Sequence, residues 1–168
     1  AGNVIHNLRS LQAKVDVISV IGECRSSMKV TNLLSEINVD IKYLVTQKDR
    51  ITSKKSRIIS SQQQVVRFDR ESIVEINTES EEAVIEIYKK IINNYDIVLI
   101  SDYGKGVLTS NLTQPLISIA NINDKKILVD PKGFDFSKYK NAYLLTPNKK
   151  EACDATSINI KDNTSITN

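Results

Sequence analysis

The sequence predicts an α/β fold with a doubly wound, mostly parallel sheet. From residue 73 onward, segments with helical spacing of apolar residues alternate with short apolar runs. Such alternation is typical of parallel strands joined by helices. Three of the apolar runs lead directly into polar clusters, which is expected where strands end at the ligand-binding edge of a sheet. The 168 residues are 40% hydrophobic and 26% charged, which suffices for one domain with a core.

The first 45 residues predict two helices and two strands. Apolar residues at helical spacing favour a helix over residues 3–12, and the β-branched run 15–21 favours a buried strand. A second helix is expected over residues 26–37, and alternation over residues 39–45 favours a half-exposed strand. The buried side of the second helix is expected to carry Leu33, Leu34 and Ile37.

Residues 50–72 differ in composition, and we expect a small β flap over about residues 39–70. The segment is basic and polar, it contains two short apolar pairs, and Ser60 to Gln62 is a candidate hairpin turn. Because side chains alternate along a strand, basic and apolar residues should share a face on each strand. These residues are Lys55, Arg57 and Ile59 on the first strand, and Val65, Arg67 and Asp69 on the second.

The rest of the chain predicts two further helices and three buried strands. Thr78, with Glu81 three residues later, predicts a capping box at the start of a helix. Apolar runs at 96–100, 127–129 and 143–145 favour short buried strands, and the first is continuous enough to predict a parallel strand covered on both faces. Residues 109–120 favour a helix, although Pro115 suits a helix only in or near its first turn.

Each of these strands ends in a polar cluster, and we expect the clusters to line one crevice. They have the sequences SDYGKG at 101–106, DPKG at 130–133 and TPNKKE at 146–151. Lysines suit phosphate oxygens, and carboxylates or amides suit Mg²⁺ and its waters. The combination favours phosphoryl transfer over acyl transfer or redox chemistry.

Simpler interpretations of the same residues stay open. The first cluster could be only a turn before a helix, DPKG is a good turn sequence, and Asn148 could simply cap a helix that contains Glu151. The basic flap could close over a phosphorylated sugar or bind RNA. The lid is favoured because Phe68 is the only aromatic residue there, whereas single-stranded nucleic acids are bound on several aromatic platforms.

Composition gives little support to several other classes of protein. The net charge of +3 is too small to imply nucleic-acid or membrane binding by itself. Cys24 and Cys153 lie far apart without ligand-like spacing, which favours thiols in a reducing compartment, and the single histidine, His6, favours a structural role. Neither a membrane-spanning apolar stretch nor a signal peptide is visible, so we expect a cytoplasmic protein.

Several segments together resemble the PfkB-type, ribokinase-like carbohydrate kinases, and among these the heptose-7-phosphate kinases of ADP-heptose synthesis. The segments are AGNVIHNL (1–8), KKSR (54–57), QQVVRFDRE (63–71), SDYGKGVL (101–108), LVDPKGFDFSKY (128–139) and LLTPNKKE (144–151). The resemblance implies a three-layer α/β/α domain that uses ATP and Mg²⁺ to phosphorylate the anomeric hydroxyl of D-glycero-D-manno-heptose 7-phosphate, on the way to the lipopolysaccharide core. It also implies a homodimer formed through the flap.

The same resemblance implies roles for individual residues. Asn3 is expected to contact the sugar, and Lys55, Arg57 and Arg67 of the flap are expected near the sugar phosphate. Asp102 and Lys105 are expected in the crevice beside the substrate. Lys132 is expected beside the transferred phosphate. Asn148 and Glu151 match the family's N-x-x-E motif, which organises the nucleotide phosphates and, through water, Mg²⁺.

Residues 1–168 are accordingly expected to be a partial kinase domain. The family's first strand and its late Gly-Ala-Gly-Asp motif do not occur in the sequence. The aspartate of that motif, which acts as the catalytic base, is therefore expected beyond residue 168, as is an adenylyltransferase domain. This piece alone is expected to be inactive. Two alternatives remain. One is another PfkB-type kinase that acts on fructose or tagatose phosphates, and the other is a non-enzymatic module that binds nucleic acid or a partner chain.

Overall fold

The fold is given by a computed structural model, which describes residues 2–61 and 63–159. It is a mixed α/β structure with two parallel sheets and one antiparallel hairpin. The chain divides into two compact units, the first made of residues 1–87 and 105–107 and the second of residues 88–104 and 108–168. The parallel strands agree with the α/β class predicted from the sequence.

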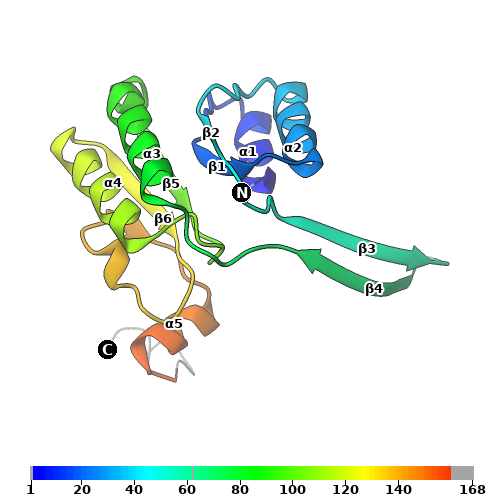
Figure 1. Cartoon of the computed structure of the whole chain (residues 1–168). Coiled ribbons are helices and arrows are strands. Elements are labelled where there is room, and N and C mark those ends of the chain that lie inside the picture. The colour runs from blue at the N-terminus through cyan, green and yellow to red at the C-terminus, as the bar shows by residue number, and fades with distance from the viewer. Residues whose placement is uncertain (1, 62, 160–168) are drawn as a thin grey trace. The chain divides into compact units, whose positions relative to one another are not determined.

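The elements of the two units follow one another along the chain (Figure 1). The first unit contains α1 (Gly2–Ser10), β1 (Ser19–Gly22), α2 (Arg25–Glu36), β2 (Leu44–Gln47), β3 (Lys54–Ser60) and β4 (Gln63–Arg70). Helix α3 (Thr78–Ile91) crosses the boundary between the units. The second unit contains η1 (Ile92–Asn94), β5 (Ile97–Ser101), α4 (Ser110–Ile122), β6 (Lys126–Asp130), η2 (Ser137–Tyr139), β7 (Leu144–Leu145) and α5 (Lys149–Thr156).

The core of the first unit lies where α1 and α2 meet the segment that leads to β2. Ile5, Leu34 and Val39 are its buried centre, and neighbouring apolar side chains of the predicted first strand and of α2 pack around them. Strands β1 and β2 pair in parallel, but β2 begins at Leu44 instead of residue 39. The expected position was wrong because Val39 is used in the core before the strand starts.

One expected core position of α2 is also wrong. Leu33 is 50% exposed, whereas Leu34 is 7% exposed. Val30 and Leu34 are four residues apart and pack on the same core, so they lie on one face of the helix. Leu33 lies about 100° away from Leu34 around the helix axis, which turns it toward solvent.

Strands β3 and β4 form the predicted antiparallel hairpin, with a bulge between Ile58 and Ile59. The hairpin covers residues 54–70, whereas the flap was expected to begin near residue 39. It is shorter because β2 pairs with β1 and not with the hairpin. Gln62, in the expected turn, lies outside the described residues. The pairing sets Lys55 opposite Asp69, and it sets residues 57 and 67 opposite each other, which confirms the expected basic face.

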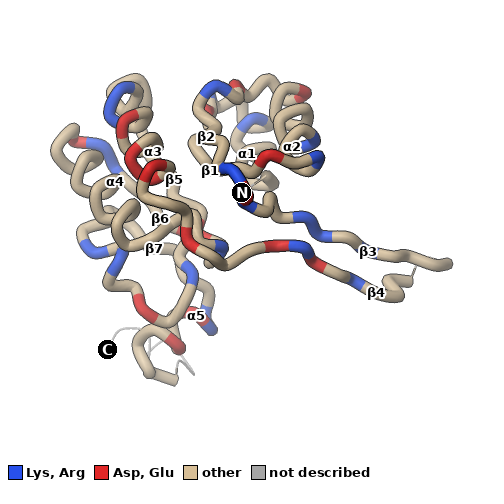
Figure 2. Tube along the Cα trace, viewed as in Figure 1, with Lys and Arg blue, Asp and Glu red and all other residues tan. Residues whose placement is uncertain are grey.

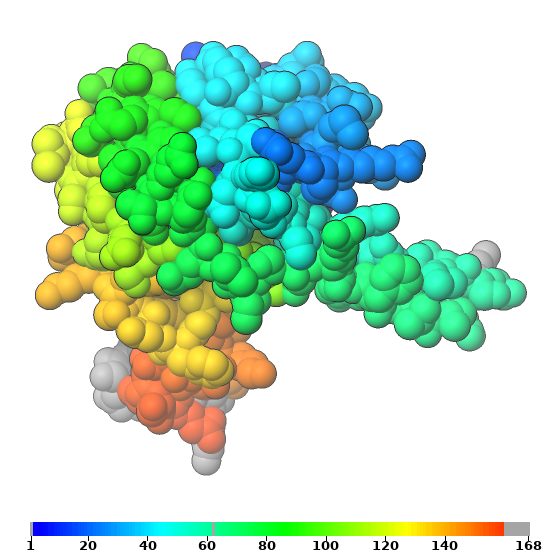
Figure 3. Space-filling model, in the orientation of Figure 1, coloured from blue at the N-terminus to red at the C-terminus, as the bar shows by residue number. Residues whose placement is uncertain are grey.

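The hairpin is open to solvent along its length. Every residue of β4 is exposed, and Figure 3 shows both strands uncovered on the face in view. Charged residues gather toward the end that joins the rest of the chain, whereas the tip carries none (Figure 2). The exposed apolar side chains are Ile58, Ile59, Val65, Val66 and Phe68.

Helix α3 is capped one residue earlier than predicted. The side-chain oxygen of Asn77 accepts a hydrogen bond of 2.9 Å from the Ser80 backbone N–H, and Thr78 is already the first helical residue. Asn is as good an N-cap as Thr, because its short side-chain carbonyl reaches the third N–H of the helix equally well. The helix itself, with acidic residues in its first turn and Lys89 and Lys90 in its last, agrees with the prediction.

The second unit is built on a parallel sheet in the order β5, β6, β7. Helix α4 packs on one face of this sheet, where Ile100, Ile127 and Val129 are buried. On β5 the alternate residues Ile97 and Leu99 are 57% and 43% exposed. Within the described residues β5 is therefore covered on one face, and the prediction of burial on both faces is not met there.

Helix α4 continues through Pro115, which lies in its second turn rather than its first. Proline has no N–H to donate to the carbonyl of Asn111, four residues earlier. Asn111 is exposed, so that carbonyl can be solvated, and the helix keeps a strong start at Thr109. The Thr109 hydroxyl accepts a hydrogen bond of 3.0 Å from the Leu112 N–H.

We expect Thr109→Ala to lower the free energy of unfolding by about 1 kcal/mol, because the mutation removes a buried N-cap. Chemical denaturation followed by circular dichroism measures this loss. Ser110→Ala is the matched control, since Ser110 is the exposed neighbour within the same helix turn. Equal stability of the two variants would show that the Thr109 cap contributes nothing.

Candidate functional site

The predicted crevice exists at the carboxyl ends of β5, β6 and β7. It is a cleft of about 320 Å³ within the second unit. All three strand-end clusters contribute to its lining, which consists of Asp102, Tyr103, Asp130, Pro131, Lys132, Thr146, Pro147, Asn148 and Glu151. The sequence-based prediction that these clusters meet is confirmed.

The clusters meet because the strands end in register. Ser101 of β5 lies opposite Asp130 of β6, and the Asp102 backbone N–H extends this pairing with a 3.0 Å bond to the Asp130 carbonyl. On the other side, the Thr146 N–H donates to the Val129 carbonyl at 2.9 Å. Each polar segment therefore leaves the sheet at the same edge.

An ion pair spans the cleft lining between the loop after β6 and helix α5. The Lys132 ammonium donates to the Glu151 carboxylate at 2.8 Å, and the two side chains are 51% and 13% exposed. Lys132 and the Asn148 backbone N–H lower the pKa of Glu151, and Glu151 in turn raises the pKa of Lys132. Both groups therefore stay charged at neutral pH.

Asn148 and Glu151 form a complete capping box at the start of α5. Asn148 Oδ1 accepts from the Glu151 N–H, and the Asn148 N–H donates to Glu151 Oε2, both at 3.0 Å. Asn148 therefore does cap the helix that contains Glu151, as the simpler interpretation of the sequence held. The box also fixes the Glu151 carboxylate, which leaves its other oxygen with Lys132 inside the cleft.

The donor set of the cleft suits a hydrated metal ion held partly by phosphate. Among residues 2–61 and 63–159, no group of three or more His, Cys, Asp or Glu side chains could form a protein-only metal site. Mg²⁺ usually keeps several waters and binds through one or two carboxylates plus substrate phosphates. Asp130 and Glu151 provide two carboxylates in the cleft, next to the Lys132 ammonium. These residues fit a Mg²⁺–phosphate group.

Asp102 lines the cleft, but its carboxylate is buried, and both of its oxygens accept hydrogen bonds from the protein. It is 5% exposed, and it accepts hydrogen bonds from the Gly104 N–H (2.7 Å), the Lys138 ammonium (2.6 Å) and the Tyr139 hydroxyl (2.6 Å). Sequence analysis expected Asp102 beside the sugar and did not identify these partners. Lys138 and Tyr139 lie in the FDFSKY stretch, and nothing in the local pattern of that stretch links it to Asp102.

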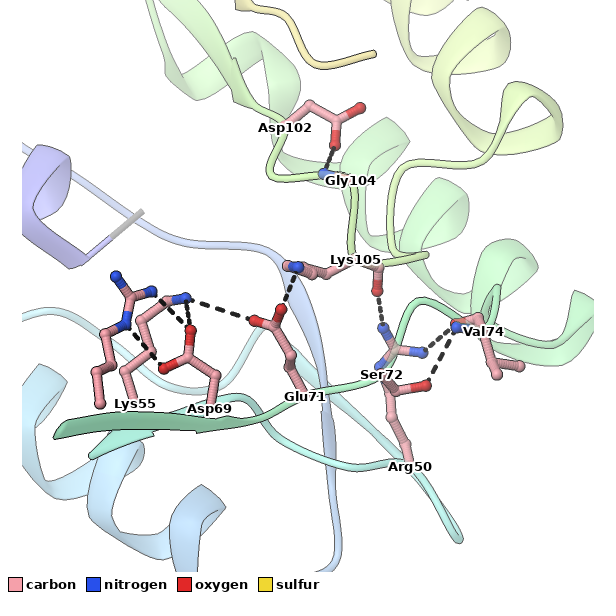
Figure 4. A network of polar contacts seen from close by, with 10 residues as sticks. Arg50, Lys55, Asp69, Glu71, Ser72, Val74, Asp102, Gly104 and Lys105 are labelled. Atoms are coloured by element: carbon pink, nitrogen blue, oxygen red, sulfur yellow. Dashed lines mark hydrogen bonds and ion pairs between the residues drawn. The ribbon is translucent and has the colours of Figure 1, made fainter. Parts of the chain in front are cut away.

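A second cluster of charges lies in the first unit, at the base of the hairpin (Figure 4). Lys55 donates to Asp69 at 2.9 Å and approaches Glu71 at 3.5 Å, and Lys105 donates to the other Glu71 oxygen. The Arg67 guanidinium binds both oxygens of Asp69, at 3.0 and 2.6 Å. Three of the expected substrate-binding residues, Lys55, Arg67 and Lys105, are thus brought together.

The carboxylates of this cluster neutralise its cations. Arg67 and Lys55 hold the pKa of Asp69 well below its usual range, and Lys105 lowers the pKa of Glu71. An anion that bound here would exchange with these carboxylates, because the same N–H groups serve both. Sequence analysis placed Asp69 on the same face as Arg67 but gave it no role as an ion-pair partner, and it did not single out Glu71, which follows directly after β4.

Arg50 and Gly106 fix the loop that carries Lys105. The Arg50 guanidinium donates to the carbonyls of Lys105 and Val74, at 2.8 and 3.3 Å, and the Ile76 N–H donates to Gly106 O at 2.8 Å. Gly106 has φ +73°, and a Cβ there would lie 2.1 Å from the Val74 carbonyl oxygen. Only glycine fits this close backbone approach.

The other two expected sugar residues are exposed in the first unit. Asn3 lies in the first turn of α1, and Arg57 lies on β3 opposite Arg67.

Within the described residues, no helix has the length and hydropathy required to cross a membrane.

The chain is similar to several curated proteins over nearly its whole length. It is 55% identical over 168 residues to the bifunctional protein HldE of Aliarcobacter butzleri, which covers 100% of this chain and 35% of that protein. It is 52% identical over 165 residues to the bifunctional protein HldE of Sulfurimonas denitrificans, which covers 98% of this chain and 35% of that protein. The chain therefore spans about a third of the length of these relatives.

Solved structures show the same fold at low sequence identity. Arabidopsis thaliana ribokinase complexed with ribose and ATP matches with a TM-score of 0.71 and 13% identity, over 99% of this chain and 53% of that one. A 2-dehydro-3-deoxygluconokinase from Thermotoga maritima matches with a TM-score of 0.72 and 12% identity, over 96% and 53% of the two chains. The pfkB family carbohydrate kinase profile matches residues 1–168, and the chain therefore belongs to this family of carbohydrate kinases.

Proposed function

We propose that this chain is part of a kinase that transfers the γ-phosphoryl group of ATP to the anomeric hydroxyl of D-glycero-D-manno-heptose 7-phosphate. The observation that carries the proposal is the cleft at the ends of β5, β6 and β7, with Lys132 and Glu151 across it, in a carbohydrate kinase chain. The relatives named HldE, at 55% and 52% identity, support the choice of a heptose phosphate. The reaction would be a cytoplasmic step of ADP-heptose synthesis for the lipopolysaccharide core.

Lys132 is proposed to bind the transferred phosphate. Its ammonium is half exposed in the cleft and is already oriented by Glu151, so little reorganisation is needed when phosphate replaces the carboxylate. Phosphoryl transfer depends mainly on positioning and on neutralising charge at the phosphate oxygens, and a lysine does both. Asn148 supports the arrangement by fixing Glu151.

Glu151 and Asp130 are proposed to hold Mg²⁺ through water, with Asn148 at the edge of the same site. When bound, Mg²⁺ would neutralise charge on the nucleotide phosphates. The protein's own contribution is the fixed carboxylate of Glu151, whose lowered pKa keeps it ionised at the pH of the reaction.

The hairpin base is proposed to bind the phosphate of the sugar. Lys55, Arg67 and Lys105 converge on two carboxylates, and a phosphate has the charge and the oxygen geometry to take their place. Asn3 and Arg57 are proposed to contact the same substrate. The exposed apolar side chains of β3 and β4 are proposed to pair with a second copy of the chain in a homodimer.

Residues 1–168 are proposed to be a part of the kinase domain, in which the flap is an insertion. The domain would be a doubly wound, three-layer α/β/α structure, and the exposed face of β5 supports a further layer over Ile97 and Leu99. The base aspartate and an adenylyltransferase domain are proposed to lie elsewhere on a longer polypeptide, in line with the share of the HldE relatives that this chain covers.

Lys132→Ala should weaken the binding of inorganic tripolyphosphate at least about tenfold, because the variant loses a charge-assisted contact to phosphate. Isothermal titration in the presence of Mg²⁺ measures the dissociation constant. Lys126→Ala is the matched control, because Lys126 is also an exposed lysine but begins β6, at the end of the strand away from the cleft. Equal binding by both variants would remove Lys132 from the phosphate site.

Arg67→Ala should weaken binding of heptose 7-phosphate about tenfold and leave binding of the unphosphorylated heptose unchanged, because the guanidinium makes paired contacts to an anion. Calorimetric titration with both sugars measures the difference. Arg70→Ala is the control, since Arg70 is also on β4 but faces the other side of the hairpin.

If wild-type protein binds no heptose 7-phosphate, the substrate assignment is wrong. Fructose and tagatose phosphates are then the next sugars to titrate, because they are the substrates of other kinases of this family type.

A further inference from the structure

A buried hydrogen-bonded group adjoins the cleft through Asp102, which is part of the cleft lining. Asp102, directly after β5, is held by Lys138 and Tyr139, which lie 36 and 37 residues further along the chain, both in η2. The Lys138 ammonium also donates to the Leu108 carbonyl at 3.2 Å. The carboxylate therefore has a counter-ion, two further donors and almost no solvent contact, as a buried charge requires.

Tyr139 connects this group to the loop that carries Lys132. Its hydroxyl donates to Asp102 Oδ2 at 2.6 Å and accepts the Lys132 backbone N–H at 3.1 Å. The hydroxyl also lies 3.3 Å from the Lys132 carbonyl oxygen, but its single proton goes to Asp102 at the shorter distance. The lone pair remains to accept the Lys132 N–H, so both bonds can exist together. Gln114 of α4 donates to the Lys138 carbonyl at 2.8 Å and holds η2 in position for this link.

The stem of Lys132 is bounded by the same network. Gly104, whose N–H is bound to Asp102 Oδ1, has φ +61°, and a Cβ added to it would lie 3.3 Å from Lys132 Cγ. Lys132 is thus fixed at its backbone by Tyr139, flanked along its stem by Gly104, and paired at its ammonium with Glu151.

Tyr139 cannot act by touching a ligand in the cleft. It is 1% exposed, and its side chain is not part of the cleft lining. The aromatic ring packs edge-on against Phe136, with ring centroids 5.9 Å apart. Burial and the neighbouring Asp102 raise the pKa of Tyr139, so the hydroxyl keeps its proton across the physiological range.

We propose that Tyr139, anchored by Asp102, is a positioning residue that sets the location of the Lys132 ammonium in the cleft. The inference rests on the proposed role of Lys132 in phosphate binding. It gives Asp102 a task other than sugar contact, because the oxygens of its carboxylate are committed to Gly104, Lys138 and Tyr139. The proposal predicts that effects of Tyr139 on phosphate binding pass through Lys132.

A double-mutant cycle with inorganic tripolyphosphate and Mg²⁺ tests this dependence. Tyr139→Phe removes only the hydroxyl, and we expect it to weaken binding about fivefold in the wild-type background, within the range measured for coupled neighbours. In the Lys132→Ala background the same substitution should change binding less than about 1.5-fold. Tyr143→Phe, at an exposed tyrosine in the same unit, is the control and should leave binding unchanged.

The outcomes separate the possible failures. Equal losses from Tyr139→Phe in both backgrounds, with a lower melting temperature, would show a general structural role and overturn the proposal. No loss from Tyr139→Phe beside a clear loss from Lys132→Ala would refute the positioning role and leave the phosphate site intact. No loss from Lys132→Ala would instead refute the proposed phosphate site, and the positioning role with it. If Tyr139→Phe does not fold, Asp102→Asn replaces it in the same cycle, with the same expected pattern.

Discussion

The parallel pairing of β6 with β5 and β7 is the constraint on which the rest of the cleft depends. Three polar segments that are distant in sequence reach one edge because Ser101 pairs with Asp130 and Val129 pairs with Leu145. The register is held by burial, since Ile127 and Val129 are fully buried on the α4 side of β6. A shift of one residue would turn these side chains outward and move the charged groups away from one another.

Both charged clusters of this chain pair each cation with a carboxylate. Lys132 is paired with Glu151 in one unit, and Lys105 is paired with Glu71 in the other. Exposed pairs of this kind contribute little to stability. Each pairing holds a long, flexible side chain in one orientation. In the proposed function, a phosphate would then meet donors that are already directed toward it.

Much of the fold could be predicted from the sequence, but element boundaries and individual burial could not. Helix α3 was identified from its acidic start and apolar stripe, yet its cap is Asn77 rather than Thr78 because either side chain can accept the same N–H bonds. Val39 was assigned to a strand because it alternates with polar residues, but it is buried against Ile5 and Leu34. The residue at which an element begins, and the burial of a single side chain, depend on packing partners that are distant in sequence. Local sequence patterns contain no information about these partners.

By itself, the sequence determined the α/β class, the flap and the three polar clusters at strand ends, because strand periodicity and glycine-rich turns are local properties. It also named Lys132, Asn148 and Glu151 as candidate site residues, and all three line the cleft. Only the tertiary structure decided that Asp102 is a buried anchor, because its partner Tyr139 is 37 residues away in the chain and comes within hydrogen-bonding distance when β5 and β6 pair. Local sequence specifies which groups are available, whereas long-range packing determines which of them meet.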